Sequence, residues 1–196
     1  HAVVVNLGDK EEREAAFEKA LEILDGRLDI LVTAAGVQRR HKSEEFPIED
    51  WDFVININLT AVFAMDQLAA KVMLKQGKGK IINIASMYGL VGNKIAPSSP
   101  YHAAKGGVVN LTRALAAEWG KHGITVNAIC PGYFWTPLTK DTLDTDWFRQ
   151  YAKGAIPLER YGNEGELDTA AIFLASPASS YVTGVALPVD GGYTTM

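Results

Sequence analysis

The chain has few of the residues that build disulfides, metal centres or polyanion-binding surfaces. Cys130 is its one cysteine, so an internal disulfide is excluded. The histidines have no metal-ligand spacing, and we expect no metal site: His1, His41, His102 and His122. A formal net charge of -4 gives no electrostatic basis for binding nucleic acid or an anionic membrane. Since no apolar run approaches the ~20 residues that span a bilayer, we expect a cytoplasmic protein in a reducing setting.

Internal repeats and low-complexity linkers are also absent, and apolar runs alternate with amphipathic segments instead. With 47% hydrophobic and 21% charged residues, the composition fits one globular domain over residues 1–196. The expected strands cover 2–7, 28–34, 80–85, 124–130 and 185–189, and the expected helices cover 9–26, 50–76, 101–121 and 163–175, with a shorter helix within 133–154. This alternation predicts an α/β fold with a doubly wound, Rossmann-like parallel sheet.

Three apolar segments predict which parts of the chain are covered by helices, by a second subunit or by a ligand. The strand 28–34 is hydrophobic nearly throughout, which is typical of a strand covered on both faces. The helix 101–121 is small or apolar nearly all round, so we expect it to contact a second subunit as well as the sheet. The segment 133–154 either forms a lid over a small ligand or packs on the body. The aromatic residues on which this prediction rests are Trp135, Trp147, Phe148 and Tyr151.

Tyr101 and Lys105 are the candidate catalytic pair. Because they are four residues apart on a helix, they share one face. A phenol with a pKa near ~10 is a poor acid at neutral pH, but a nearby ammonium lowers that pKa. Ser86 follows the strand 80–85 at the sheet edge where ligands bind, so Ser86 and Tyr101 could reach one substrate oxygen. Two plainer interpretations are that the tyrosine-lysine spacing arises by chance and that Ser86 starts a turn.

Five motifs stand in the order of a known family. They are Asn58 in Ile-Asn-Leu-Thr, Ser86 after Ile-Ile-Asn-Ile-Ala, the Tyr101/Lys105 pair, Pro131-Gly132 followed by Thr136, and Val189-Asp190-Gly191-Gly192. On these motifs the chain resembles the short-chain dehydrogenase/reductase family along its entire length. Within that family, residues 36–40, 81–87 and 190–192 are similar to gluconate 5-dehydrogenases and 2-deoxygluconate 3-dehydrogenases.

The resemblance implies a catalytic tetrad of Asn58, Ser86, Tyr101 and Lys105. Ser86 would hold the carbonyl or hydroxyl oxygen, Tyr101 would transfer its proton, and Lys105 would lower the tyrosine pKa and bind the nicotinamide ribose. Asn58 would bend its helix and hold a water that links Lys105 to solvent. The resemblance also implies NAD or NADP as cofactor. Its contacts would be Asn6, Leu7, Ala34, Ala35, Gly36, Tyr101, Lys105, Pro131, Gly132, Phe134 and Thr136.

The chain departs from the family pattern at several places. The family usually has Asn-Asn-Ala-Gly where this chain has Thr33-Ala34-Ala35-Gly36, and Asn6 replaces a usual aspartate. The loop between Ser86 and Tyr101 is longer than usual. No glycine-rich turn of the kind that binds a pyrophosphate at a helix N-terminus is present. By family topology the first two strands are therefore lacking, and we expect these residues to be part of a longer polypeptide or another segment to fill the gap.

Several functions fit these features. The leading one is an NAD(P)-dependent oxidoreductase that interconverts a secondary alcohol and a ketone, with a sugar acid such as gluconate or keto-gluconate as substrate. Arg39 and Arg40 follow a strand's carboxyl end and could bind its carboxylate, with Ser86 and Tyr101 at the reacting oxygen. The alternatives are a 3-oxoacyl thioester reductase and a non-catalytic binding or assembly module. The resemblance implies a homotetramer formed through the helices 50–76 and 101–121.

Overall fold

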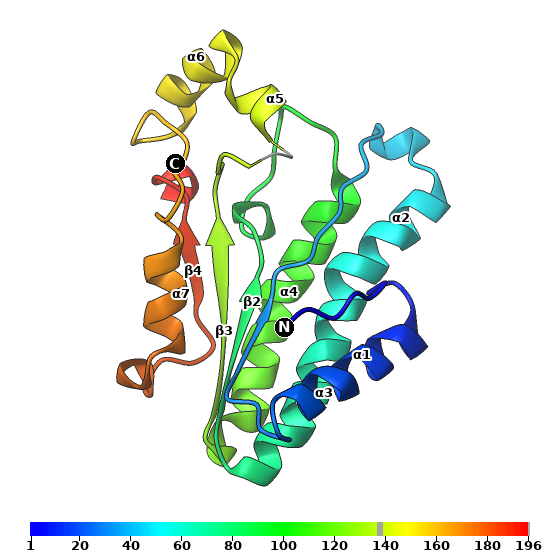
Figure 1. The fold of residues 1–196 in the computed structure, drawn as a ribbon. Helices are drawn as coiled ribbons and strands as arrows, with labels where there is room; N and C mark the ends of the chain where they lie inside the picture. Colours follow the sequence, from blue (N-terminus) through cyan, green and yellow to red (C-terminus); the bar gives the residue numbers. More distant parts are fainter. Residues whose placement is uncertain (137–138, 196) are drawn as a thin grey trace.

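A parallel sheet forms the centre of the computed structural model, which describes residues 1–136 and 139–195 (Figure 1). Its strands lie in the order β1 (Ile30–Thr33), β2 (Gly79–Ile84), β3 (Ile124–Pro131) and β4 (Ala186–Val189), and each pairs in parallel with the next. Because every pair is parallel, the carboxyl ends of all four strands lie at one edge of the sheet. The predicted α/β architecture is confirmed.

The helices follow the expected order. They are α1 (Lys10–Ile23), α2 (Ile48–Ile55), α3 (Ala61–Gln76), α4 (Ser99–Trp119), α5 (Lys140–Leu143), α6 (Asp146–Ala155) and α7 (Asp168–Ala175). Asp9 caps α1 by accepting the Glu12 N–H, and Gly77 ends α3 in the left-handed region at φ 69°. Single 3₁₀ turns are η1 (Ser43–Glu45), η3 (Met87–Gly89), η4 (Gly120–His122), η5 (Pro177–Ser179) and η6 (Tyr193–Thr195).

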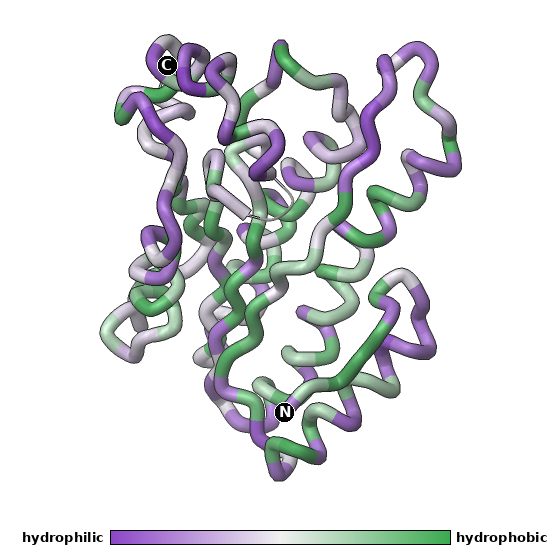
Figure 2. Tube along the Cα trace, turned by 45° about the horizontal axis from the view of Figure 1, so that its top comes forward, coloured by the Kyte–Doolittle hydropathy of each residue, from purple (hydrophilic) through white to green (hydrophobic). Residues whose placement is uncertain are grey.

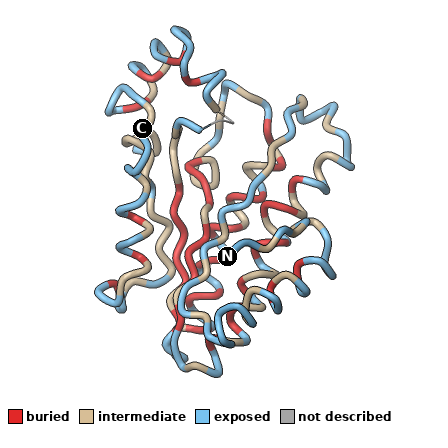
Figure 3. Tube along the Cα trace, viewed as in Figure 1, coloured by how far each residue is buried: buried red, intermediate tan, exposed pale blue. Residues whose placement is uncertain are grey.

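Alternate residues of each strand pack on opposite helical layers. On one face, Ile81 and Val126 pack with α3 and α4. On the other face, Ile82 and Ile129 pack with Leu174 of α7. Side chains alternate across a strand, so both faces of β2 and β3 must be apolar to be covered in this way. Figure 3 shows β2 and β3 buried along most of their length, and Figure 2 shows hydrophobic residues along the same strands.

The prediction that the strand 28–34 is covered on both faces is wrong for the described residues. Leu31 packs toward α3, but Ile30 and Val32 point the other way and are 42% and 48% exposed. The helix α7 covers β2 and β3 on that face and does not extend over β1. A single short helix is too narrow for a four-stranded face, so the outer strand keeps one apolar side open.

The prediction of a strand at residues 2–7 is also wrong. This segment is extended but pairs with no strand in the described sheet, and Val4 is 99% exposed. Its apolar run has no adjacent strand to satisfy its backbone groups, and a strand requires such a partner. The segment is instead held by local contacts: the Asn6 N–H donates to Glu12 Oε2, and Arg13 donates to the Leu7 carbonyl.

One helical stretch, Ile48–Gln76, is long and apolar enough for a membrane span by length and composition alone. The sequence did not suggest it, because polar residues interrupt its apolar runs. Two of those residues, Asn58 and Asp66, are fully buried, and α3 packs against β1 and β2. The apolar residues of this stretch therefore serve the core of the domain.

Candidate functional site

Ser86 stands just beyond the carboxyl end of β2, where the chain turns into η3. The Ser86 side chain caps that turn by accepting the Tyr88 N–H at 3.1 Å. The turn lies against α4, and a Cβ at Gly89 would come within 2.6 Å of the Lys105 carbonyl oxygen. Only glycine permits that approach. The turn that carries Ser86 is thus fixed against the helix that carries Tyr101 and Lys105.

Tyr101 and Lys105 lie in the first two turns of α4, which begins at Ser99 with a proline in its first turn. The Lys105 ammonium lies 5.8 Å from the Tyr101 ring centroid and donates to the Ile84 carbonyl at 2.7 Å. Burial lowers the pKa of Lys105 to about 8. Burial raises the pKa of Tyr101, and the neighbouring Ser86 hydroxyl acts in the opposite direction. An ammonium that donates one hydrogen bond keeps two further donors for a ligand.

Asn58 lies in a π-helical turn, η2 (Asn56–Thr60), which joins α2 to α3. Such turns are rare and occur mostly as local interruptions of α-helices, frequently at functional sites. The Asn58 carboxamide accepts the Val37 N–H and donates to the Val37 carbonyl, both at 2.8 Å. A Cβ at Gly36 would lie 3.3 Å from Asn58 Oδ1 and 3.9 Å from Lys105 Nζ. The π-helical turn therefore holds the loop after β1 close to Lys105.

These elements surround a cavity of about 380 Å³ at the carboxyl edge of the sheet. Ser86, Tyr101 and Lys105 all line it, together with Arg40. The predicted cofactor residues that line it are Ala34, Gly36, Pro131, Gly132, Phe134 and Thr136. A smaller apolar cavity of about 200 Å³ lies under β1 and includes Leu7, Ala34 and Ala35. The two cavities share Ala34, so most of the predicted cofactor residues lie in one continuous region.

Three predicted residues line neither cavity: Asn58, which holds the loop at Val37, and Asn6 and Arg39. The Asn6 side chain accepts the Gly8 N–H at 3.0 Å and lines neither cavity. The Arg39 guanidinium lies 3.5 Å from Asp50 and 4.7 Å from the centroid of the Phe53 ring. The next residue, Arg40, is the arginine that lines the larger cavity.

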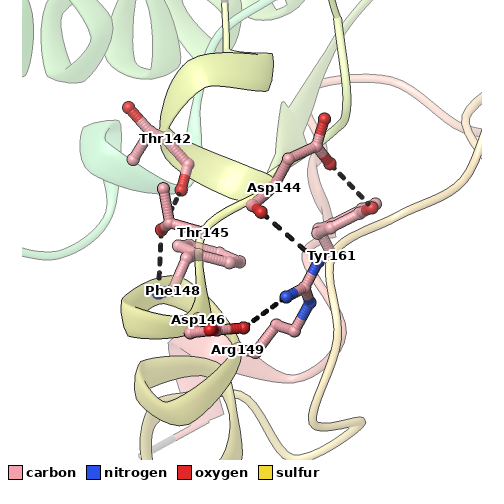
Figure 4. A network of polar contacts seen from close by, with 7 residues as sticks. All are labelled: Thr142, Asp144, Thr145, Asp146, Phe148, Arg149 and Tyr161. Carbon is pink, nitrogen blue, oxygen red and sulfur yellow. Dashed lines mark hydrogen bonds and ion pairs between the residues drawn. The ribbon is translucent and has the colours of Figure 1, made fainter.

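The segment 133–154, for which the sequence left a lid or packing on the body open, has one aromatic residue of each kind. One is buried in the body, and the other is exposed at the cavity. Thr145 caps α6 by accepting the Phe148 N–H at 3.1 Å, and Phe148 is buried (Figure 4). Asp144 accepts from the Tyr161 hydroxyl through its side chain and from Arg149 through its backbone carbonyl. Trp147 also lines the cavity but is 54% exposed. The segment is anchored by Phe148 and keeps Trp147 at the rim.

Sequence reasoning did not single out Tyr88 or the Tyr133 side chain as site residues. Both line the cavity, and their hydroxyl oxygens are 2.6 Å apart. Tyr88 is two residues after Ser86 on a turn that follows a strand, and this position is the signal that could have indicated it. Tyr133 follows Pro131-Gly132, and the sequence interpretation assigned a cofactor contact to that dipeptide but no role to the side chain after it.

Comparisons with known proteins agree with this geometry. The family model described as enoyl-(acyl carrier protein) reductase matches residues 1–194. The chain is 44% identical over 186 residues to the 2-dehydro-3-deoxy-D-gluconate 5-dehydrogenase of Bacillus subtilis strain 168, over 94% of this chain and 72% of that protein. It is 42% identical over 191 residues to the 5-keto-D-gluconate 5-reductase of Escherichia coli K12, over 97% of this chain and 74% of that protein.

A solved structure shows the same fold. The gluconate 5-dehydrogenase of Burkholderia cenocepacia J2315 in complex with NADP and tartrate superposes with a TM-score of 0.91 at 39% identity. The superposition covers 98% of this chain and 74% of that one. With the match of the family model and the positions of Ser86, Tyr101 and Lys105 around one cavity, the chain belongs to the short-chain dehydrogenase/reductase family.

Proposed function

We propose that the chain is a nicotinamide-dependent oxidoreductase that interconverts a secondary alcohol and a ketone of a sugar acid. The observation that carries this proposal is the single cavity lined by Ser86, Tyr101, Lys105 and Arg40. A phenol, a hydroxyl and an ammonium around one space are the groups needed to move a proton at a substrate oxygen. A guanidinium in the same space provides a partner for a carboxylate. The names of the relatives, which include gluconate and keto-gluconate enzymes, support this substrate class.

The residues fit a nicotinamide cofactor. Glycine at position 36 leaves open the space beside Asn58 Oδ1 and Lys105 Nζ that a Cβ would occupy. The Lys105 ammonium donates one hydrogen bond, to the Ile84 carbonyl, and so keeps two donors for a pair of ribose hydroxyls. Ala34, Gly36, Pro131 and Gly132 would hold the nicotinamide half, and either NAD or NADP satisfies the proposal. When bound, the nicotinamide donates or accepts the hydride at the substrate carbon.

The protein side of the reaction is proton transfer. In the reductive direction Tyr101 donates its proton to the developing alkoxide, while Ser86 donates a hydrogen bond to the same oxygen. The buried Lys105 ammonium would stabilise the tyrosinate that remains. The Ser86 hydroxyl opposes the effect of burial on the pKa of Tyr101. Asn58 holds the loop after β1 in place and, with a bound water, would connect Lys105 to solvent.

We propose Arg40, rather than Arg39, as the main carboxylate contact. Arg40 lines the cavity, whereas Arg39 lies against Asp50 and Phe53. The two neighbouring arginines therefore form a matched pair. We expect Arg40→Ala to raise the KM for 5-keto-gluconate about 10-fold or more and Arg39→Ala to change it less than about 2-fold, since charge-assisted bonds are worth ~1.5–3 kcal/mol. A larger effect at Arg39 would identify that arginine as the carboxylate contact instead.

The experiment that tests the function is reduction of 5-keto-gluconate with NADH and with NADPH, measured as loss of nicotinamide absorbance. Tyr101→Phe should abolish turnover while coenzyme binding, followed by fluorescence, persists. Faster reduction of a 3-oxoacyl thioester would favour the alternative substrate class. Absence of coenzyme binding by the wild-type protein would favour the non-catalytic module.

We also propose assembly into a homotetramer through α2–α3 and α4. Phe53 of α2 and Phe63 of α3 are 39% and 41% exposed, and paired helices from a second copy would cover them. Light scattering at micromolar concentration tests this, and a monomer would contradict it. A cytoplasmic location is part of the same proposal.

A further inference from the structure

Four tyrosine side chains pack together beside the larger cavity, and two of them line it. Tyr88 and Tyr133 line the cavity and share a 2.6 Å hydrogen bond. Tyr151 and Tyr193 pack edge-on against Tyr133, line neither cavity and share a 3.1 Å hydrogen bond. Tyr88 and Tyr133 form what we name the hydroxyl pair, and the other two provide an internal control of the same chemistry.

Both members of the hydroxyl pair are fixed in place. The Tyr88 ring stacks on His102, with centroids 4.8 Å apart, and His102 Nδ1 lies 2.9 Å from the Ser98 carbonyl. A carbonyl can only accept, so Nδ1 carries a proton and the imidazole orientation is set. The Tyr133 ring packs edge-on against buried Phe148 at 4.9 Å. A preorganised pair loses little conformational entropy when it binds a ligand.

The pair keeps hydrogen-bonding capacity after its mutual bond is made. Each hydroxyl has one proton and two lone pairs, and the shared bond uses one proton and one lone pair. Tyr193 and Tyr151 are further hydrogen-bonding neighbours of Tyr88 and Tyr133, and the unused lone pairs remain for a ligand. Burial raises the pKa of both phenols, so both stay neutral and protonated at physiological pH. Two neutral hydroxyls can each donate or accept a hydrogen bond. A substrate hydroxyl also donates and accepts, so it is a complementary ligand for the pair.

The pair also adjoins the reacting position. Ser86 accepts the Tyr88 N–H at 3.1 Å, so one turn presents both the Ser86 hydroxyl and the Tyr88 ring. We propose that the Tyr88/Tyr133 hydroxyl pair binds a substrate hydroxyl on a carbon near the reacting one and so selects polyhydroxylated ketones over simple ones. This inference rests on the proposed function and adds a specificity determinant to it.

The test compares 5-keto-gluconate with 5-oxohexanoate, which keeps the carboxylate and the ketone but lacks the other hydroxyls. The readout is the ratio of the two kcat/KM values. We expect Tyr88→Phe and Tyr133→Phe each to lower this ratio about 5- to 30-fold, mostly by lowering kcat/KM for 5-keto-gluconate, as loss of one hydrogen bond to substrate predicts. Tyr151→Phe and Tyr193→Phe should leave it within about 2-fold.

The outcomes separate the two proposals. If the wild-type protein reduces 5-keto-gluconate but the ratio is unchanged in Tyr88→Phe and Tyr133→Phe, the hydroxyl pair has no recognition role and the proposed function stands. An equal loss of kcat/KM for both substrates would overturn the inference. It would indicate that the tyrosines only position Ser86. A wild-type protein that reduces neither substrate contradicts the proposed function and, with it, this inference. Thermal melting of each variant shows whether a lost activity reflects a lost fold.

Discussion

Two buried ionisable groups on neighbouring helices, Lys105 of α4 and Asp66 of α3, have different surroundings. Lys105 lines the larger cavity and is 4% exposed, whereas Asp66 is 0% exposed and lines neither cavity. Burial shifts both pKa values toward neutrality, to about 8 for Lys105 and about 7 for Asp66. A shifted pKa therefore does not by itself mark a functional site in this molecule, whereas spare donors that face a cavity do.

The surroundings of Asp66 are those of a closed structural network. Asn83 on β2 donates to Asp66 Oδ2 at 2.9 Å and accepts from Thr33 on β1 at 2.7 Å. The same Asn83 amide lies 3.3 Å from Thr112 on α4. Asp66 Oδ1 has no partner among the described residues. The network connects two strands and two helices, and Asp66 lines neither of the two cavities described above.

The largest expected effect belongs to Lys105. We expect Lys105→Met to lower kcat about 10³-fold, because it removes the cation beside Tyr101 and a ligand donor. Stability should not fall with it. Since burial lowers the pKa of this lysine from 10.5 to about 8, the ammonium opposes folding below pH 8. Steady-state kinetics measures the loss of kcat, and thermal melting at pH 7 measures the stability. A lower melting temperature than the wild type would contradict the prediction for stability.

We expect Asp66→Asn to change the free energy of unfolding and to leave kcat within about 2-fold. Folding raises the pKa of this carboxyl from 3.8 to about 7. Its favourable contribution is therefore complete below pH ~4 and is lost as the pH rises to about 7. At pH 8 the variant should be more stable than the wild type by on the order of 2–4 kcal/mol, at 1.36 kcal/mol per pKa unit.

Urea unfolding of both proteins from pH 4 to pH 8 measures this difference. The gap between variant and wild type should widen across that range and should nearly vanish at pH 4. A constant gap would mean that Asp66 does not titrate with folding.

The smallest expected effect is at Thr112, which makes the longest bond of the network. We expect Thr112→Val to destabilise the protein by about 1 kcal/mol or less, because the Asn83 amide keeps its bond to Asp66. Turnover should be unchanged. A loss above about 3 kcal/mol would show that the network is more cooperative than its pairwise bonds indicate.

The sequence predicted the architecture well where local signals and burial agree. The cap at Asp9, the left-handed Gly77 and the apolar runs of β2 and β3 each determine one element with little help from elsewhere. Residues 2–7 and the open face of β1 were predicted wrongly for one reason. An apolar run shows that a segment can be covered, but only the tertiary arrangement shows whether a partner lies there.

The candidate site was predictable to a similar degree. Motif order indicated Asn58, Ser86, Tyr101 and Lys105, and the structure places the last three on one cavity wall. The choice between Arg39 and Arg40 depends on how the loop after β1 packs on α2, which no local pattern encodes. The hydroxyl pair depends on a contact between residues 45 positions apart, so it was not visible in the sequence.

The close approach of Gly89 to the Lys105 carbonyl has a consequence for how this enzyme can change. The contact fixes Ser86 and the start of α4 independently of the residues between 90 and 98. Asn93, Ile95 and Ala96 of that stretch form part of the cavity wall. The stretch can therefore grow, shrink or exchange residues while the proton-transfer groups keep their spacing. This part of the substrate-binding wall can therefore evolve without disturbing the proton-transfer groups.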